Sequence, residues 1–362
     1  MRVIIAAGGT GGHIYPALAI ANQLNSSYAA QILFVGTPRG LESRLVPQAG
    51  YALSLIQIGQ LNQVSLRTKL RTMLDLPLSL IRCRKLLRDF RPHVVVGVGG
   101  YASGPTMAAA ILMHLPTLAV EPNAFPGLAN RVVGKRVTAA AINFAAAEKY
   151  FRNPEVTGIP VRSDFFGLSP RPTGAPPHLL IFGGSQGARA LNILMPQIAA
   201  KLLDAVPGLT ILHQAGARHA DSTLAAYFAS GAPSSRWQVL DFLDDMPRRF
   251  EVADLVLSRS GASTVAELAA AGKPSLLIPF PQSADDHQRK NAEAFVEAGA
   301  SRMLIEANLT PSALLETLTD MLNHREALQR MSSAARGLAH ADANERITSM
   351  VAELAGTPHP PR

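Results

Sequence analysis

The sequence contains a single cysteine, Cys83, which excludes a disulfide framework and a zinc site built from several cysteines. It contains no uninterrupted apolar run of the roughly 18–20 residues that a membrane-spanning helix needs. No basic segment followed by an apolar stretch opens the chain, because Met1–Ala7 has the pattern of a strand that runs into glycines. We therefore expect a folded cytoplasmic protein that does not cross a membrane.

Two similar stretches, one in each half of the chain, predict two similar domains. Val3–Ala7 runs into Gly8–Gly12 and a helical pattern from Pro16 to Leu24, and Leu179–Phe182 runs into Gly183–Gly187 and a helical pattern from Ala188. Strands that alternate with helices indicate parallel sheets with helices on both faces, an α/β class. Further strands are predicted at Gln31–Val35, His93–Val98, Thr117–Val120, Val137–Ile142, Thr210–Gln214, Leu255–Leu257 and Ser275–Ile278.

The stretch Arg152–Pro177 has linker composition, with six prolines and three glycines. We expect an N-terminal Rossmann-like domain at residues 1–157, a linker at 158–177 and a C-terminal Rossmann-like domain at 178–338. Residues 339–362 are expected to form a C-terminal helix, which packs back on the N-terminal domain, and a tail.

Each glycine turn between a strand and a helix leaves backbone N–H groups at the positive end of a helix, where phosphate binds well. The turn at Gly8–Gly12 is not a dinucleotide fingerprint, since Ile14 stands where the third glycine would fall. It is not a P-loop either, because Gly-Lys-Ser/Thr is missing. Glycine in such turns also serves packing alone. Two such turns, one opening each domain, favour a cleft with an anion site on each wall.

A third anion site is predicted at the start of a helix over Ala262–Ala271, which Gly272 and Pro274 close. This helix follows the strand Leu255–Leu257 and so begins at the carboxyl edge of the sheet, where ligands bind. Glu267 lies about one and a half turns into the helix, where its carboxylate is able to accept two ribose hydroxyls. The alternative is a capped helix with a surface glutamate.

Positive charge is concentrated in one segment. Eight basic residues against two acids between Arg67 and Arg91 give +6 of the net charge of +8. The segment is rich in leucine and lacks the interleaved aromatics of a single-strand nucleic-acid binder, so nucleic acid is disfavoured. A solvated basic face and adhesion to an anionic membrane both remain open. Asp75 and Pro77 predict two short helical pieces around a break, and the membrane patch is expected to comprise Arg82, Arg84, Lys85 and Arg88.

Seven motifs in register resemble the MurG family of N-acetylglucosaminyltransferases, which complete the lipid-linked disaccharide of bacterial peptidoglycan. They span the whole chain and are Gly8–His13, Gly99–Pro105, Glu121–Asn123, Gly158–Arg162, Gly183–Arg189, Arg259–Glu267, and Asp286–Gln288 with Asn291. The resemblance implies the GT-B fold, with the active site in a cleft between two Rossmann-like domains. It implies UDP-N-acetylglucosamine as donor, an undecaprenyl-diphospho-N-acetylmuramoyl-pentapeptide acceptor, inversion at the anomeric carbon, no cofactor and no tightly held metal.

The resemblance also assigns binding residues. Arg162 would supply a fixed positive charge near the diphosphate, Leu243 would contact uracil through its backbone, and Tyr101 would position the acceptor. The residues expected to contact the donor are Thr10, Gly11, Gly12, Asn123, Arg162, Ser185, Leu243, Ala262, Ser263, Thr264, Val265, Ala266, Glu267 and Gln288.

Transfer needs a base for the acceptor hydroxyl. His13 is the natural choice, because an unperturbed pKa of about 6.5 suits neutral operation. Glu121 is the competing base or an orienting carboxylate. With no Asp-x-Asp pair to hold a divalent metal, helix ends and Arg162 must hold the charge of departing UDP.

Other functions share parts of this pattern. A UDP-N-acetylglucosamine 2-epimerase would share fold and donor but would need no lipid surface, and a membrane-recruiting subunit without activity would not need both half-sites. The resemblance implies a peripheral location at the cytoplasmic face of the bacterial plasma membrane, and it leaves room for partners among the cell-wall synthesis proteins.

Overall fold

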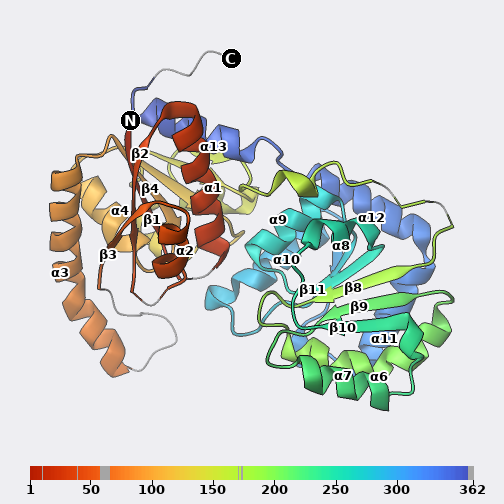
Figure 1. Cartoon of the computed structure of the whole chain (residues 1–362). Coiled ribbons are helices and arrows are strands. Elements are labelled where there is room, and N and C mark those ends of the chain that lie inside the picture. The colour runs from red at the N-terminus through yellow and green to blue at the C-terminus, as the bar shows by residue number, and fades with distance from the viewer. Residues whose placement is uncertain (10, 39, 58–65, 170, 173, 358–362) are drawn as a thin grey trace. The chain divides into compact units, whose positions relative to one another are not determined.

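The computed structural model describes residues 1–9, 11–38, 40–57, 66–169, 171–172 and 174–357, and for residues 66–76 it describes the backbone alone. The chain forms two compact units (Figure 1). The first comprises Met1–Val161 together with the chain from His340 onward, and the second comprises Arg162–Ala339. Among the helices of the described ranges, none is long and apolar enough to cross a membrane.

The first unit contains a seven-stranded sheet in the order β3-β2-β1-β4-β5-β6-β7, with every neighbouring pair parallel. Its strands are β1 (Arg2–Ala7), β2 (Gln31–Gly36), β3 (Ala52–Leu55), β4 (Val94–Gly99), β5 (Thr117–Glu121), β6 (Ala139–Ile142) and β7 (Pro154–Val156). Its helices are α1 (Gly11–Tyr28), α2 (Glu42–Gln48), α3 (Leu66–Phe90), α4 (Ser103–Leu112), α5 (Leu128–Val133) and α13 (Ala343–Leu354), with a 3-10 turn at Ala145–Tyr150.

Successive residues of β1 point to opposite faces of this sheet, and both faces are covered. Val3 and Ile5 pack in a core cluster with residues of α1 and with Ile347 and Val351 of α13. Helices α1 and α13 lie side by side on this face (Figure 1). Ile4 packs on the other face with residues of α3 and α4. A strand buried on both faces is apolar at every position, and for this reason the apolar run Val3–Ala7 predicted a strand.

The second unit contains a six-stranded parallel sheet in the order β10-β9-β8-β11-β12-β13. Its strands are β8 (His178–Phe182), β9 (Thr210–Gln214), β10 (Trp237–Leu240), β11 (Leu255–Ser258), β12 (Ser275–Leu277) and β13 (Ser301–Met303). Its helices are α6 (Arg189–Ala205), α7 (Ala220–Ala229), α8 (Met246–Val252), α9 (Ala262–Ala271), α10 (His287–Glu297), α11 (Pro311–Asn323) and α12 (Arg325–Gly337). Short 3-10 turns lie at Ser163–Phe165, Ser234–Arg236, Ala284–Asp286 and Glu306–Asn308.

These sheets confirm the prediction of two parallel-sheet α/β domains, and all nine predicted strands are present within one or two residues at each end. The helix Ala262–Ala271 is confirmed with its bounds, and Gly272 ends it in the left-handed conformation with φ 58°. Pro154–Val156 lies inside the stretch with linker composition but before the predicted linker at 158–177, and it forms β7 of the first sheet.

Two helix predictions were wrong. The first helix begins at Gly11 and not near Pro16, so Gly11 and Gly12 belong to its first turn. The segment expected to break near Pro77 is one continuous helix, α3. Proline removes a single N–H donor from a helix, and the buried positions Ser79, Cys83 and Leu87, spaced four apart, hold the helix against its unit.

Candidate functional site

The carboxyl ends of β1 and β4 lie side by side, because these two strands pair in parallel. The turns that follow them pack without room for side chains. A Cβ on Gly100 would lie 2.1 Å from the carbonyl oxygen of Gly8, and one on Gly99 would lie 2.8 Å from Cδ2 of His13. Both glycines have positive φ, 108° for Gly99 and 82° for Gly100, which other residues rarely adopt. Because glycine has no side chain at these positions, the imidazole of His13 packs directly against the turn after β4.

Tyr101 follows these glycines and keeps 36% of its surface exposed at the same edge of the sheet. The predicted acceptor-positioning residue and the predicted base thus lie on neighbouring turns, one after β4 and the other in the first turn of α1. Thr10, predicted to contact the donor, lies outside the described residues.

The predicted phosphate donors of the first glycine turn are only partly available. The N–H of Gly9 donates to Oε2 of Glu42 at 3.0 Å, so this donor is used inside the protein. Gly11 and Gly12 open α1, where the first N–H groups of a helix have no partner inside the helix and its positive end favours an anion.

Glu121 ends β5 and is almost fully buried, with 1% of its surface exposed. Four donors surround its carboxylate. Oε1 accepts from the backbone N–H and the side-chain amide of Asn123, at 2.9 and 3.1 Å. Oε2 accepts from the N–H of Gly127 at 3.1 Å and from Nδ2 of Asn130 at 2.9 Å.

Burial raises the pKa of Glu121 to about 7, and these donated hydrogen bonds oppose the rise. The Glu121 carboxylate is thus hydrogen-bonded to several residues of the loop from residue 121 to residue 130, and it holds this loop together at the carboxyl edge of the sheet. Asn123 is 8% exposed and held in that loop by Glu121. Asn130, which no sequence motif singled out, is the second amide of the loop, and it also donates to the carbonyl oxygen of Val120 at 3.1 Å.

In the second unit, Glu267 lies on α9 and is half-buried. Burial raises the pKa of its carboxyl group to about 7, and the guanidinium of Arg162 opposes that rise. The Arg162 side chain is exposed, and its Cζ lies 5.1 Å from the centre of the Phe165 ring. Two predicted donor residues that are 105 positions apart in the printed sequence thus act electrostatically on each other.

The start of α9 is tied to α10 through Ser260. Its Oγ donates to the carbonyl oxygen of Gln288 at 2.8 Å, and Nδ2 of Asn291 donates to its carbonyl oxygen at 3.1 Å. Oε1 of Gln288 accepts from the N–H of Phe280 at 3.0 Å and from the N–H of Ser260 at 3.3 Å. With its oxygen held in this way, Gln288 presents the amide nitrogen of its side chain as a donor.

The turn before α10 is strained. Asp285 and Asp286 both have left-handed backbone conformations, with φ 52° and 55°. Strain of about 1–3 kcal/mol per residue persists only where the surrounding structure imposes it. Here the bonds of Gln288 and Asn291 to Ser260 fix α10 immediately after these two residues.

The remaining predicted donor residues also follow parallel strands at their carboxyl ends. Ser185 is exposed in the turn after β8, Leu243 is buried in the loop after β10, and Ala262–Ala266 form the first turn and a half of α9 after β11. In the turn after β8, a Cβ on Gly187 would lie 1.9 Å from the carbonyl oxygen of Ala215, so part of this glycine turn serves packing.

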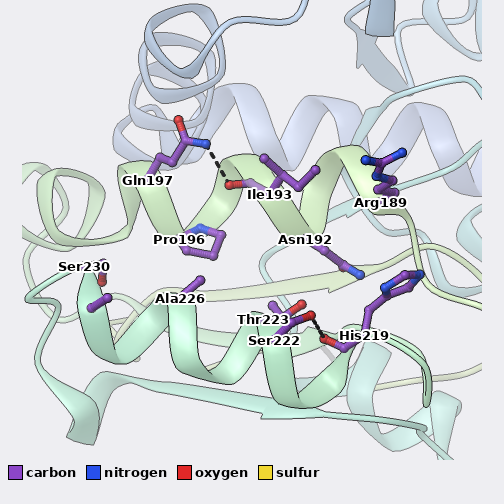
Figure 2. Close-up of a pocket in the computed structure, with 11 residues that line it drawn as sticks. Arg189, Asn192, Ile193, Pro196, Gln197, His219, Ser222, Thr223, Ala226 and Ser230 are labelled. Carbon is purple, nitrogen blue, oxygen red and sulfur yellow. Dashed lines mark hydrogen bonds between the residues drawn. The ribbon is translucent and has the colours of Figure 1, made fainter.

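A groove of about 590 Å³ lies between α6 and α7 (Figure 2). Arg189 and His219 stand at one end of it, and the hydroxyl of Ser222 donates to the carbonyl oxygen of His219, the residue before α7, at 3.0 Å (Figure 2). The predicted donor residues do not line this groove. Among the described residues, no group of three or more His, Cys, Asp and Glu side chains is placed to hold a metal ion.

Comparison with known proteins decides the family. Residues 3–142 match the glycosyltransferase family 28 N-terminal domain and residues 178–347 match the glycosyltransferase family 28 C-terminal domain. The chain is 41% identical over 354 residues to the UDP-N-acetylglucosamine--N-acetylmuramyl-(pentapeptide) pyrophosphoryl-undecaprenol N-acetylglucosamine transferase of Solibacter usitatus, covering 97% of this chain and 96% of the relative. The chain belongs to the MurG family.

Two further comparisons agree with this family. The transferase of the same name from Syntrophotalea carbinolica is 42% identical over 360 residues, covering 98% of this chain and 99% of the relative. The crystal structure of MurG from Acinetobacter baumannii superposes with a TM-score of 0.84 at 30% identity, covering 97% of this chain and 99% of that one. The two sheets and their connections are thus the GT-B fold of the MurG family, as the seven motifs predicted.

Proposed function

We propose that this chain transfers N-acetylglucosamine from UDP-N-acetylglucosamine to undecaprenyl-diphospho-N-acetylmuramoyl-pentapeptide in peptidoglycan synthesis. The observation that carries the proposal is identity of about 41% to transferases of this name over nearly the whole chain. Both units also retain the polar groups that the reaction needs, at the carboxyl edges of their sheets.

The donor side belongs to the second unit. The carboxylate of Glu267 accepts the ribose hydroxyls, and Arg162 pairs with the diphosphate. The amino end of α9 adds backbone N–H groups and the positive end of a helix of 10 residues, which stabilise charge on departing UDP. Gln288 donates from its amide nitrogen, Ser185 from its turn, and Leu243 contacts the base through its backbone.

In the transfer step, the acceptor hydroxyl oxygen attacks C1 of N-acetylglucosamine, the bond from C1 to the UDP oxygen breaks, and the hydroxyl proton passes to a base. We assign the base to His13. A carboxylate offers about four lone-pair sites, and four donors already occupy those of Glu121. Glu121 is therefore the orienting carboxylate of the loop that carries Asn123, and the configuration at C1 is inverted because the attack is direct.

The acceptor tail places the reaction at a membrane, and α3 has the surface for this. Leu78 and Ile81 keep 54% and 64% of their surface exposed. Lys85 and Arg88 continue the same stripe at helical spacing, and both are exposed. Apolar side chains flanked by cations are typical of binding to an anionic membrane surface. We assign peripheral binding at the cytoplasmic face to the patch Arg82, Arg84, Lys85 and Arg88.

The purified chain tests the proposal when it is incubated with UDP-N-acetylglucosamine, with and without a polyprenyl-diphosphate-linked N-acetylmuramoyl-peptide. We expect UDP release only in the presence of the acceptor, together with the acceptor enlarged by one N-acetylglucosamine. Conversion of the nucleotide sugar alone to its 2-epimer would make the chain an epimerase and would overturn the proposal.

A further inference from the structure

Glu42 is a buried carboxylate beneath the first glycine turn, and no sequence motif pointed to it. It is the first residue of α2 and has no exposed surface. Its Oε1 accepts from the backbone N–H and from the hydroxyl of Thr37, both at 2.8 Å. Its Oε2 accepts from the N–H of Gly9 at 3.0 Å. The side chain thus bridges the turn after β2 and the turn after β1.

Three glycines leave the space that this carboxylate fills. A Cβ on Gly8 would lie 2.8 Å from Oε1 of Glu42, one on Gly36 would lie 2.4 Å from Cγ, and one on Gly40 would lie 1.9 Å from Oε2. Glu42 cannot swing away from such a Cβ without breaking its bonds, because it is enclosed and bonded at both oxygens. The glycines around it are therefore matched to the Glu42 side chain.

Gly9 is held at both of its backbone polar groups. Its N–H donates to Glu42, and its carbonyl oxygen accepts from the N–H of Leu41 at 3.4 Å. Its φ of 93° lies in a region that glycine alone occupies readily. Two residues later α1 begins, and His13 lies in its first turn against Gly99. Gly9 thus lies two residues before the start of α1, held at both polar groups.

We propose that Glu42 is a positioning residue for the transfer reaction. By holding the N–H of Gly9, two residues before α1, it helps to place the start of α1 and with it the imidazole of His13 at the edge of the sheet. This inference rests on the proposed function, since it takes His13 as the base. Glu42 itself acts through Gly9 and need not touch a substrate.

Two nearly isosteric variants separate positioning from a purely structural role. Glu42→Gln replaces one oxygen by an NH2 group, so it cannot accept from both Thr37 and Gly9. Thr37→Val removes only the hydroxyl donor and leaves the bond to Gly9 intact. We expect Glu42→Gln to lower kcat by about tenfold or more, because small displacements of a catalytic group are costly. The KM for UDP-N-acetylglucosamine should rise by a smaller factor than kcat falls, because the proposed donor contacts of Glu267 and Arg162 belong to the other unit. Thr37→Val should keep both constants.

Hydrogen–deuterium exchange of the segment from residue 1 to residue 14 provides a readout that needs no activity. We expect faster exchange there in Glu42→Gln, and no change in Thr37→Val. If Glu42→Gln does not fold, Glu42→Asp, which keeps the charge but is too short to bridge both turns, takes its place in both measurements. Unchanged kcat in a folded Glu42 variant, or equal loss of kcat in Thr37→Val, would overturn the inference. A wild-type chain that transfers nothing would refute the proposed function instead, and the exchange experiment would still test the hold on Gly9.

Discussion

Burial raises the pKa of Glu267 to about 7, and the guanidinium of Arg162 opposes that rise. Because the folded pKa lies above the ordinary value of 4.5, the folded state binds the Glu267 proton more tightly than the unfolded state does. The stabilising contribution of this proton is fully present below pH 4.5 and is lost as the pH rises through about 7. Above that pH, the free protein keeps a half-buried negative charge on Glu267, and the hydroxyls of a bound ribose would stabilise it by hydrogen bonds.

The first prediction concerns the pH dependence of donor binding. Because ribose hydroxyls donate to the carboxylate, UDP-N-acetylglucosamine should bind more weakly as the pH falls from 8 to 6, and binding near neutral pH should release a proton. Calorimetry in two buffers of different ionisation enthalpy measures that proton. The intact nucleotide sugar is the right probe, since its diphosphate has no group that titrates in this range.

Two variants of Glu267 complete this test. Glu267→Ala should raise the donor KM by about tenfold or more, since a hydrogen bond to a charged group is worth roughly 1.5–3 kcal/mol. Glu267→Gln should abolish the proton release, and at pH 8 it should unfold at a higher temperature than the wild type because no charge is buried. Unchanged donor binding in both variants would remove Glu267 from the site.

The second prediction concerns the base. His13→Ala should lower kcat by roughly 10²–10⁴-fold, the usual contribution of a general base. The affinity for UDP should change little, since the proposed donor residues of α9 and α10 belong to the other unit. A loss below about tenfold would return the role to Glu121, and Glu121→Gln would then have to show the larger effect on kcat at saturating substrates.

The third prediction moves His13 without removing it. Gly99→Ala adds a Cβ that would lie 2.8 Å from the imidazole, at a φ of 108°. We expect kcat to fall by about 10²-fold, the scale for misplacing a catalytic group by about an ångström. Gly50→Ala is the matched control, because Gly50 has φ 82° and a Cβ there would meet nothing within 4 Å.

Both glycine variants lose stability through backbone strain, so thermal unfolding should shift in each. Only Gly99→Ala should lose turnover in the folded fraction. Comparable kcat values in the two variants would show that the place of His13 beside Gly99 does not matter for the reaction.

The strands that the sequence failed to predict share one property. They are β3, β7, β10 and β13, which form the four edges of the two sheets. A central strand is buried on both faces and is apolar throughout, as β4 is with all six residues buried. An edge strand is covered less: β3 has no fully buried residue, and β7 contains a proline that an edge tolerates. Such short, mixed segments carry no periodic signal.

The residues of the candidate site also differ in how well the sequence predicted their positions. The position of His13, Tyr101 and Glu121 at the carboxyl edge of the sheet was predictable, because each lies at or shortly after the end of a buried strand. Their roles in the reaction stay predictions. Glu42 and Asn130 were not predicted, since each acts through contacts with residues that are distant in sequence or in irregular turns. A buried glutamate at the start of a helix looks like an ordinary surface residue in the sequence. Only the space left by Gly8, Gly36 and Gly40 reveals its place.

The last prediction concerns the membrane. In α3, Arg82, Arg84, Lys85 and Arg88 are all exposed, while Cys83 and Leu87 face the core. Each cation near an anionic surface contributes about 1 kcal/mol. Reversing these four residues to glutamate should therefore abolish binding to vesicles that contain anionic lipid, measured by co-sedimentation. Turnover of a water-soluble, short-chain acceptor should be retained, because the buried face of α3 is untouched.

Net charge alone must be controlled, since the four reversals make the whole chain more acidic. Reversing Lys201, Arg218, Arg325 and Arg330, which are exposed in the second unit, changes the net charge by the same amount. We expect this control variant to keep its vesicle binding, and Leu78→Ala with Ile81→Ala to weaken it without any change in charge. If both charge variants lose vesicle binding equally, attraction to the membrane comes from the net charge of the chain and not from the basic face of α3. If the α3 variant still binds, or if it loses turnover of the soluble acceptor as well, the basic face of α3 supports the fold and does not dock the enzyme.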